Sequence, residues 1–386
     1  MDVRWLVVAV LVSWSWLAST TVVRAQAAGS QAPSQTVTAR VIRILEEGMT
    51  TVGPVTQPYQ RLLVELTSGP EEGKVVEITI GVRDLNTSGQ RFQPGDRLYV
   101  SVSTGPDGSR AYTLLDRDRS TPLAVLAVLF AGAIVALGRW KGLRALLGLV
   151  FTFVVLIWVL VPLILRGYPP VPVAIVVSFV VFTVTLFLTH GVGRMSLAAM
   201  AGTSVSLLLT GLLAALFVET AGLTGLADEE SSFLQVVLGD RAVSPRGLLL
   251  AGMLVGALGV LDDITVSQSS LVFELRRANA ALSGWELFSA GVRVGRDHIA
   301  ATVNTLVLAY AGAALPLLLL FSQLDEPLLW TVNREIVAQE IVQTLVGSLG
   351  LIAAVPLTTG FAAWLAVRMP AETIGEQPHQ HAHHHY

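Results

Sequence analysis

The chain has 386 residues, of which 53% are hydrophobic and 14% are charged, and its mean hydropathy is +0.64. Because an ordinary soluble domain carries roughly 25% charged residues, this deficit indicates that lipid surrounds much of the chain. The formal net charge of −3 gives no indication of nucleic-acid binding, and the absence of cysteine excludes disulfides, thiolate metal sites and cysteine catalysis.

Residues 1–27 have the pattern of a secretory signal peptide. Arg4 provides a basic start, residues 5–17 are mostly apolar, and Ala25-Gln26-Ala27 has the small-x-small pattern of a cleavage site. An uncleaved anchor helix fits the same pattern, and both interpretations stay open. In either case the segment that follows is predicted to be exported.

A small all-β domain is predicted over residues 28–118, after a linker rich in Ala, Gly, Ser, Gln and Pro at its start. Alternating apolar residues between turn sequences predict five strands, at 37–44, 60–67, 74–79, 97–103 and 111–115. Short strands at this spacing favour a barrel of the OB or SH3 type. Its aromatic residues are scattered. A structural domain, or one that docks another membrane or envelope protein, is therefore favoured over one that binds an oligosaccharide or peptide.

Apolar runs dominate residues 119–368, and a membrane-spanning helix needs about 20 such residues. About seven spans are predicted, at 121–138, 144–166, 171–190, 195–218, 247–266, 299–322 and 340–367. The predicted fold is an all-α membrane bundle with an N-terminal signal or anchor helix and a small extracytoplasmic all-β domain.

The distribution of basic residues predicts the orientation of these spans. Basic residues gather at 139–144, at His190 and Arg194, and in the loop 267–298, whereas the intervening loops are short or acidic. Since basic loops stay in the cytoplasm, the β domain is predicted to lie outside the bacterial inner membrane and the C-terminus inside.

The clearest chemical pattern lies in the fifth predicted span. Gly252, Gly256 and Gly259 are spaced for close approach of another helix, so a packing role is favoured. Asp262 and Asp263 follow, about 21 Å into the helix if it begins near residue 248. A carboxylate at mid-membrane depth costs roughly 2.5–3.5 kcal/mol on insertion scales, so the pair is predicted to face a cation, a partner or water. The alternative is that the helix ends before the pair, which then caps the next helix.

Four further polar residues are candidates for transport or ion binding, namely Gln268, Asp297, His298 and Asn304. The Asp297-His298 pair could relay a proton, although a cap at the start of a helix is favoured. Asn304, inside the sixth predicted span, is typical of a residue that hydrogen-bonds across helices.

Two prolines are predicted to mark irregular points in the last two spans. Pro316 predicts a kink. Pro356, with glycines and threonines around it, fits either a broken helix that lines a transport site or a harmless bend.

Residues 369–386 form a predicted cytoplasmic tail rich in histidine. Imidazole runs bind Zn, Ni or Cu weakly. A disordered tail is favoured, and no metal or other cofactor is predicted. The weak candidate ligands are His379, His381, His383, His384 and His385.

Three stretches of the chain resemble a known family. Residues 256–263 (GALGVLDD), 267–275 (SQSSLVFEL) and 295–306 (GRDHIAATVNTL) are similar to the YibE/F family of bacterial membrane proteins, and the resemblance extends over nearly the whole chain. It implies a multi-pass membrane protein. Because the family has no established biochemical activity, it implies no substrate and no catalytic residue.

A transporter or permease is the favoured function, with Asp262 or Asp263 binding a cation or proton. Two alternatives stay open: a permease subunit that depends on a cytoplasmic ATPase, suggested by two short helices around Gly284 in 274–298, and a non-catalytic scaffold. An aspartyl protease is disfavoured, because adjacent residues on a helix point about 100° apart. No Walker A, nucleophile-elbow or zinc-protease motif occurs, so an enzyme is not predicted. The oligomeric state is not specified by the sequence.

Overall fold

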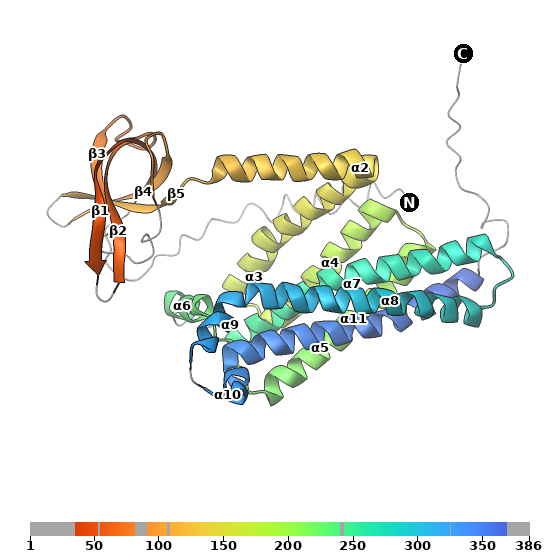
Figure 1. The fold of residues 1–386 in the computed structure, drawn as a ribbon. Helices are drawn as coiled ribbons and strands as arrows, with labels where there is room; N and C mark the ends of the chain where they lie inside the picture. Colours follow the sequence, from red (N-terminus) through yellow and green to blue (C-terminus); the bar gives the residue numbers. More distant parts are fainter. Residues whose placement is uncertain are drawn as a thin grey trace, which may run out of the picture. The chain divides into compact units, whose positions relative to one another are not determined.

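The computed structural model describes residues 35–52, 55–81, 91–105, 109–239, 243–324 and 326–368 (Figure 1). These residues divide into two compact units, with the boundary between Leu129 and Phe130. The predicted signal or anchor segment 1–27 and the tail 369–386, with its five histidines, lie outside the described residues.

The first unit is built on an antiparallel five-stranded sheet with the order β3-β2-β1-β4-β5. All five predicted strands are confirmed, and the sheet curves into a half-barrel. Its strands are β1 (Gln35–Val52), β2 (Val55–Leu66), β3 (Val75–Ile80), β4 (Arg97–Thr104) and β5 (Arg110–Arg117).

The first strand is longer than the pattern 37–44 predicted, because β1 and β2 continue as a paired arm to Val52 and Val55. The pairing register shifts between Val41 and Arg43 and again between Ile44 and Glu46, which interrupts the alternation on which the prediction depended. Tyr59 donates a 2.6 Å hydrogen bond to Glu46 across the arm.

One side chain joins the two edges of this half-barrel. Glu71, in the turn before β3, pairs with Arg110 of β5 at 2.5 Å and with Lys74 at 2.8 Å. It also accepts a 2.6 Å hydrogen bond from the Tyr112 hydroxyl on β5. These contacts hold the pKa of Glu71 at about 2, below the carboxyl's usual range, chiefly through the hydrogen bond from Arg110.

The second unit is helical, and the first described helix of the chain, Ser120–Val155, begins within the first unit and continues across the boundary into the second. The helical elements are α2 (Ser120–Val155), the short π-helix η2 (Leu156–Leu160), α3 (Val161–Leu165), α4 (Pro170–His190), α5 (Arg194–Thr220), α6 (Glu229–Leu238), α7 (Pro245–Ala278), α8 (Gly284–Ala313), α9 (Leu315–Ser322), α10 (Leu328–Asn333) and α11 (Glu335–Val367).

By length and composition, five helical stretches of the described chain could cross a membrane, or six if α8 and α9, bent by 62°, form one span. The predicted seven are not confirmed. One part of the difference is that the first two predicted spans, 121–138 and 144–166, correspond to one 46-residue stretch, Ser120–Leu165. That stretch is interrupted by a non-helical residue, Arg139, with φ 47°. The other part is the sixth predicted span, 299–322, which is divided between α8 and α9.

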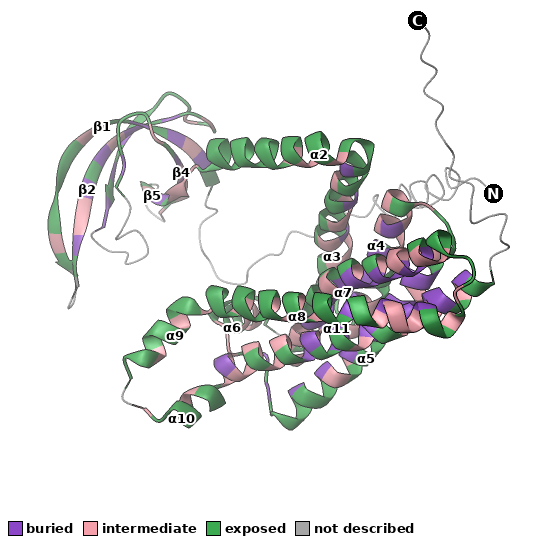
Figure 2. Cartoon of the chain, turned by 45° about the vertical axis from the view of Figure 1, so that its right-hand side comes forward, coloured by how far each residue is buried: buried purple, intermediate pink, exposed green. Residues whose placement is uncertain are grey.

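The core of the helical unit lies where α5, α7 and α11 meet, and buried residues gather along these helices (Figure 2). A Cβ built at Gly202 of α5 would lie 2.9 Å from the Thr358 Cα of α11. A Cβ at Gly350 of α11 would lie 3.1 Å from the Thr210 Cβ of α5. These two pairs bring α5 and α11 into close contact, as small residues do in membrane bundles.

The glycines singled out in the sequence do not make this kind of contact. Within the described part of the chain, no atom lies within 4 Å of a Cβ built at Gly252 or Gly259, and Gly256 meets only the Tyr310 hydroxyl at 3.8 Å. These glycines follow one another on an exposed face of α7, so their spacing does not produce the predicted packing seam within this chain.

The two prolines also differ in effect. The 62° bend falls at Ala314, between α8 and α9, and Pro316 lies in the first turn of α9. Pro356 lies inside α11, which continues as one helix from Glu335 to Val367. The broken-helix interpretation of Pro356 is therefore wrong.

Candidate functional site

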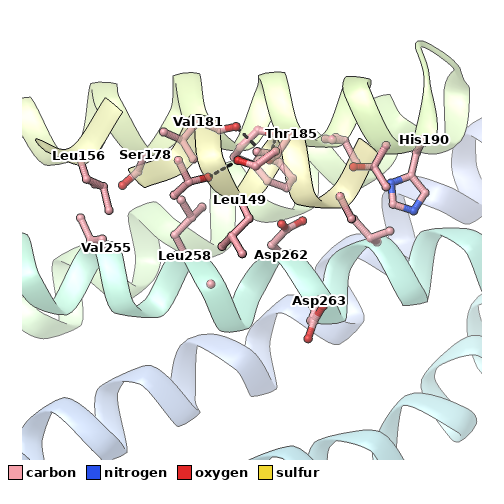
Figure 3. Close-up of a pocket in the computed structure, with 18 of the residues that line it drawn as sticks. Leu149, Leu156, Ser178, Val181, Thr185, His190, Val255, Leu258, Asp262 and Asp263 are labelled. Atoms are coloured by element: carbon pink, nitrogen blue, oxygen red, sulfur yellow. Dashed lines mark hydrogen bonds between the residues drawn. The ribbon is translucent and has the colours of Figure 1, made fainter. Parts of the chain in front are cut away.

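A pocket of about 640 Å³ lies between α2 with η2, α4 and α7, all within the helical unit (Figure 3). Its wall is mainly aliphatic. Its polar side chains include Thr152 of α2, Ser178, Thr185, Thr189 and His190 of α4, and Asp262, Asp263, Ser267 and Ser270 of α7.

The two aspartates of α7 face different ways. Asp262 is partly buried and projects into the space between α7 and α4, whereas Asp263 is exposed and lies on the other side of the helix (Figure 3). This follows from a helix rotation of about 100° per residue. The flanking Leu261 and Ile264 are 1% and 0% exposed, so core packing fixes the rotation of α7 about its axis.

Contacts with α5 fix the level of Asp262 along the bundle. Near one end, Arg246 of α7 pairs with Glu219 of α5 at 2.7 Å. Near the other end, the Ser269 hydroxyl of α7 donates to the Met195 carbonyl of α5 at 2.7 Å. Arg246 and Ser269 are about 35 Å apart along the axis of α7. Asp262 lies between them, about 10 Å from Ser269 in the direction of Arg246. The aspartate pair is thus well inside the bundle.

The capping interpretation of this pair is wrong. α7 does not end before Asp262 but continues to Ala278, since Thr203 of α5 and Thr265 of α7 share a buried 2.6 Å hydrogen bond beyond it. Both acids therefore lie on the body of a long helix.

At the end of the pocket away from Asp262, the hydroxyl group of Ser178 makes no hydrogen bond to a described residue. Ser178 is 2% exposed. Thr185, which lies nearer Asp262, donates instead to the Val181 carbonyl at 2.9 Å. Because a buried hydroxyl without a partner is unfavourable by about 1–3 kcal/mol, Ser178 is a natural contact for a bound molecule.

The other polar candidates lie away from this pocket. Gln268 is buried, accepts a 3.1 Å hydrogen bond from Thr359 of α11, and lies against Gly295 of α8, so its contacts are those of a packing residue. Asp297, His298 and Asn304 are exposed on α8 and do not line the pocket.

The segment 274–298 is not a pair of short helices. It contains the end of α7 and the start of α8, which Ser283 and Glu286 cap reciprocally. The two-helix pattern that suggested an ATPase-coupling loop is therefore absent from the structure.

Sequence reasoning missed the contribution of α4. Ser178, Thr185 and Thr189 are spaced by seven and four residues, which places them on one face of a helix that is otherwise strongly apolar. That spacing was the available signal for a polar surface facing a pocket.

The pocket does not have the composition of a metal centre. Among the described residues no group of three His, Cys, Asp or Glu side chains is arranged to hold a metal ion. Calcium takes six to eight oxygen ligands and magnesium requires near-octahedral geometry, whereas one carboxylate points into this largely aliphatic space.

The comparisons with known proteins place the helical unit in a family. The family described as YibE/F-like protein matches residues 126–368, which is more than half of the 386 residues. The match leaves the sheet outside, so it is narrower than the whole-chain resemblance predicted. No curated protein and no solved structure matches the chain. Together with its apolar helices, the match shows that this membrane protein belongs to the YibE/F-like family.

Proposed function

We propose that this protein is an inner-membrane permease in which the pocket at Asp262 is the translocation site. The observation that carries the proposal is the direction of Asp262, which points into a pocket of about 640 Å³ while lying about 10 Å inside the bundle. A carboxylate at membrane depth normally faces water, a cation or a transported solute. No catalytic step is part of the proposal.

The proposed orientation has seven spans with the sheet outside. The stretch Ser120–Leu165 is about 69 Å long when straight, more than twice the roughly 30 Å hydrocarbon thickness, so we divide it into two spans at Arg139. Counting α8 with α9 as one span then gives seven. The end that carries Arg139, Lys141, His190 and Arg194 is assigned to the cytoplasm because of its basic residues.

In this orientation the end of the pocket at His190 faces the cytoplasm. The pocket extends along α7 from Val255 to Ser270, about 22 Å, and His190 lies at the basic end (Figure 3). At the outer end α4 and α7 close together, since a Cβ at Gly247 would lie 3.4 Å from the Pro170 Cδ. These two features support an inward-facing state, in which the cytoplasmic side of the site would be accessible and the outer side closed.

The proposal is tested with purified protein in proteoliposomes on a solid-supported membrane, where charge movement is recorded after jumps in H⁺, Na⁺, K⁺ or small organic cations. Asp262→Asn is expected to abolish the charge movement found with the wild type. Asp263→Asn is the matched control, because it removes a carboxylate one residue away that points elsewhere, and it is expected to retain most of the signal. Absence of any signal with the wild type, or an equal loss in both variants, contradicts this role for Asp262.

A further inference from the structure

The charged residues of the pocket favour a ligand with a positive charge. Asp262 is the carboxylate that projects into it, whereas Asp263 borders it but points to the exposed side of α7. The lining contains no lysine or arginine, and His190 lies at one end. In a partly desolvated space this arrangement attracts a cation and repels an anion.

The walls of the pocket select an apolar body. Leu149, Leu156, Val181, Val255 and Leu258 line the space between the levels of Ser178 and Asp262 (Figure 3). The volume of about 640 Å³ lies within the roughly 300–1,000 Å³ of small-molecule sites. A bare inorganic ion would gain nothing from such walls.

Ser178 supplies a second polar contact at a defined separation. Because Gly247 packs against Pro170, α4 and α7 run side by side, and Ser178 lies near the level of Val255 (Figure 3). Asp262 is about 10 Å farther along the same axis. A ligand that reaches both groups therefore has its charge at one end and a hydrogen-bonding group about 10 Å away.

From these three observations we infer that the pocket binds small organic amines. The ammonium group donates to the Asp262 carboxylate, an aliphatic or aromatic body fills the space along α4 and α7, and a polar group at the far end pairs with the Ser178 hydroxyl. Small organic amines are thus the inferred substrate class of the proposed permease. Transport of the amine rests on the proposed function, whereas its binding does not.

The binding is tested with three probes of the same shape and different charge: 4-phenylbutylamine, 4-phenylbutan-1-ol and 4-phenylbutyrate. Thermal unfolding of the full chain in detergent is followed by the fluorescence of its 8 tryptophans as each probe is added. The amine is expected to raise the midpoint of the wild type and of Asp263→Asn, with at least about tenfold weaker apparent binding to Asp262→Asn. Asp262→Glu is expected to retain the preference for the amine. Equal shifts with amine and alcohol, or unchanged amine binding in Asp262→Asn, overturn the inference.

A second comparison tests the far end of the ligand. Adding a para-hydroxyl group to 4-phenylbutylamine is expected to tighten binding to the wild type several-fold, and Ser178→Ala is expected to remove this gain while leaving binding of the parent amine nearly unchanged. An equal gain in Ser178→Ala overturns the assigned ligand orientation.

The two proposals fail separately. Amine binding without charge movement would contradict the permease and leave the amine site standing. Charge movement driven by protons alone, with no amine binding, would contradict the amine site and leave the permease standing.

Discussion

Replacing Gly202 by alanine places a methyl group inside the α5–α11 contact. The new Cβ would lie 2.8 Å from the Thr358 Cβ and 2.9 Å from its Cα, and it would also overlap the Thr358 hydroxyl. The hydroxyl belongs to a fully buried side chain and can move only by repacking its neighbours, and the backbone Cα can move only with the helix. Restoring an ordinary contact therefore requires the two helices to separate by about 0.5–1 Å, which also loosens the Thr210–Gly350 contact farther along.

Overpacking of this kind costs about 1–3 kcal/mol. Gly252→Ala is the matched control, because that residue lies on α7 with no described atom within 4 Å of the new Cβ. The gain in helix propensity from glycine to alanine is common to both substitutions and cancels in the comparison. Gly202→Ala is thus expected to be about 1–3 kcal/mol less stable than Gly252→Ala.

The assay is reversible unfolding in mixed micelles by increasing amounts of dodecyl sulfate, followed by tryptophan fluorescence. Adding Thr358→Ala to Gly202→Ala is expected to restore part of the stability, since it removes the overlapping hydroxyl but leaves the Cβ and Cα in place. Equal midpoints for Gly202→Ala and Gly252→Ala would refute the close α5–α11 contact.

Two other contacts give measurable predictions. In a double-mutant cycle, Thr203→Ala and Thr265→Val in the same micelle assay are expected to couple by about 0.6–1.7 kcal/mol through their buried 2.6 Å hydrogen bond, and additive effects would contradict it. For the sheet, the lowered pKa of Glu71, about 2, means that its contribution to stability is complete above the carboxyl's ordinary pKa and is lost as the pH falls from there toward about 2. Pepsin digestion of the full chain between pH 4.5 and 2, followed by mass spectrometry of the sheet peptides, is expected to cleave Glu71→Gln faster than the wild type at the upper pH and equally at the lower. A constant ratio of rates would count against the Glu71–Arg110 pair.

Regular elements with strong patterns were predictable from the sequence. The predicted span 171–190 coincides within one residue with α4, because proline at its start and glycine after His190 bound an unbroken apolar run. The strand predicted at 97–103 coincides with β4, since its buried residues Leu98 and Val100 alternate with more exposed ones.

The true end of α7 was not predictable from its apolar run. That run stops at Val266, but the helix continues because its polar residues have partners on other helices. Ser269 donates to the Met195 carbonyl, and Gln268 accepts from Thr359. Hydropathy does not distinguish a polar residue that ends a helix from one whose hydrogen bond is satisfied by a neighbouring helix.

The candidate site was predictable in part. Two acids inside an apolar helix are unfavourable enough to identify α7 as the helix of interest. Which acid faces the pocket depends on how α7 is rotated against its core, and the contribution of Ser178 depends on α4 packing beside α7. Both depend on how helices pack against one another, which cannot be inferred from the periodicity of a single helix.

Accessibility of the pocket to water tests the central claim most directly, and the cysteine-free chain allows it. Val255→Cys and Val266→Cys place single thiols in the pocket, and Ile264→Cys, buried at 0% exposure on the core side of the same helix, is the control. A charged, membrane-impermeant methanethiosulfonate applied to the cytoplasmic face of membrane vesicles is expected to modify both pocket thiols and to leave the control unmodified. If the pocket thiols react as slowly as the control, no aqueous path reaches Asp262 and the permease account is contradicted.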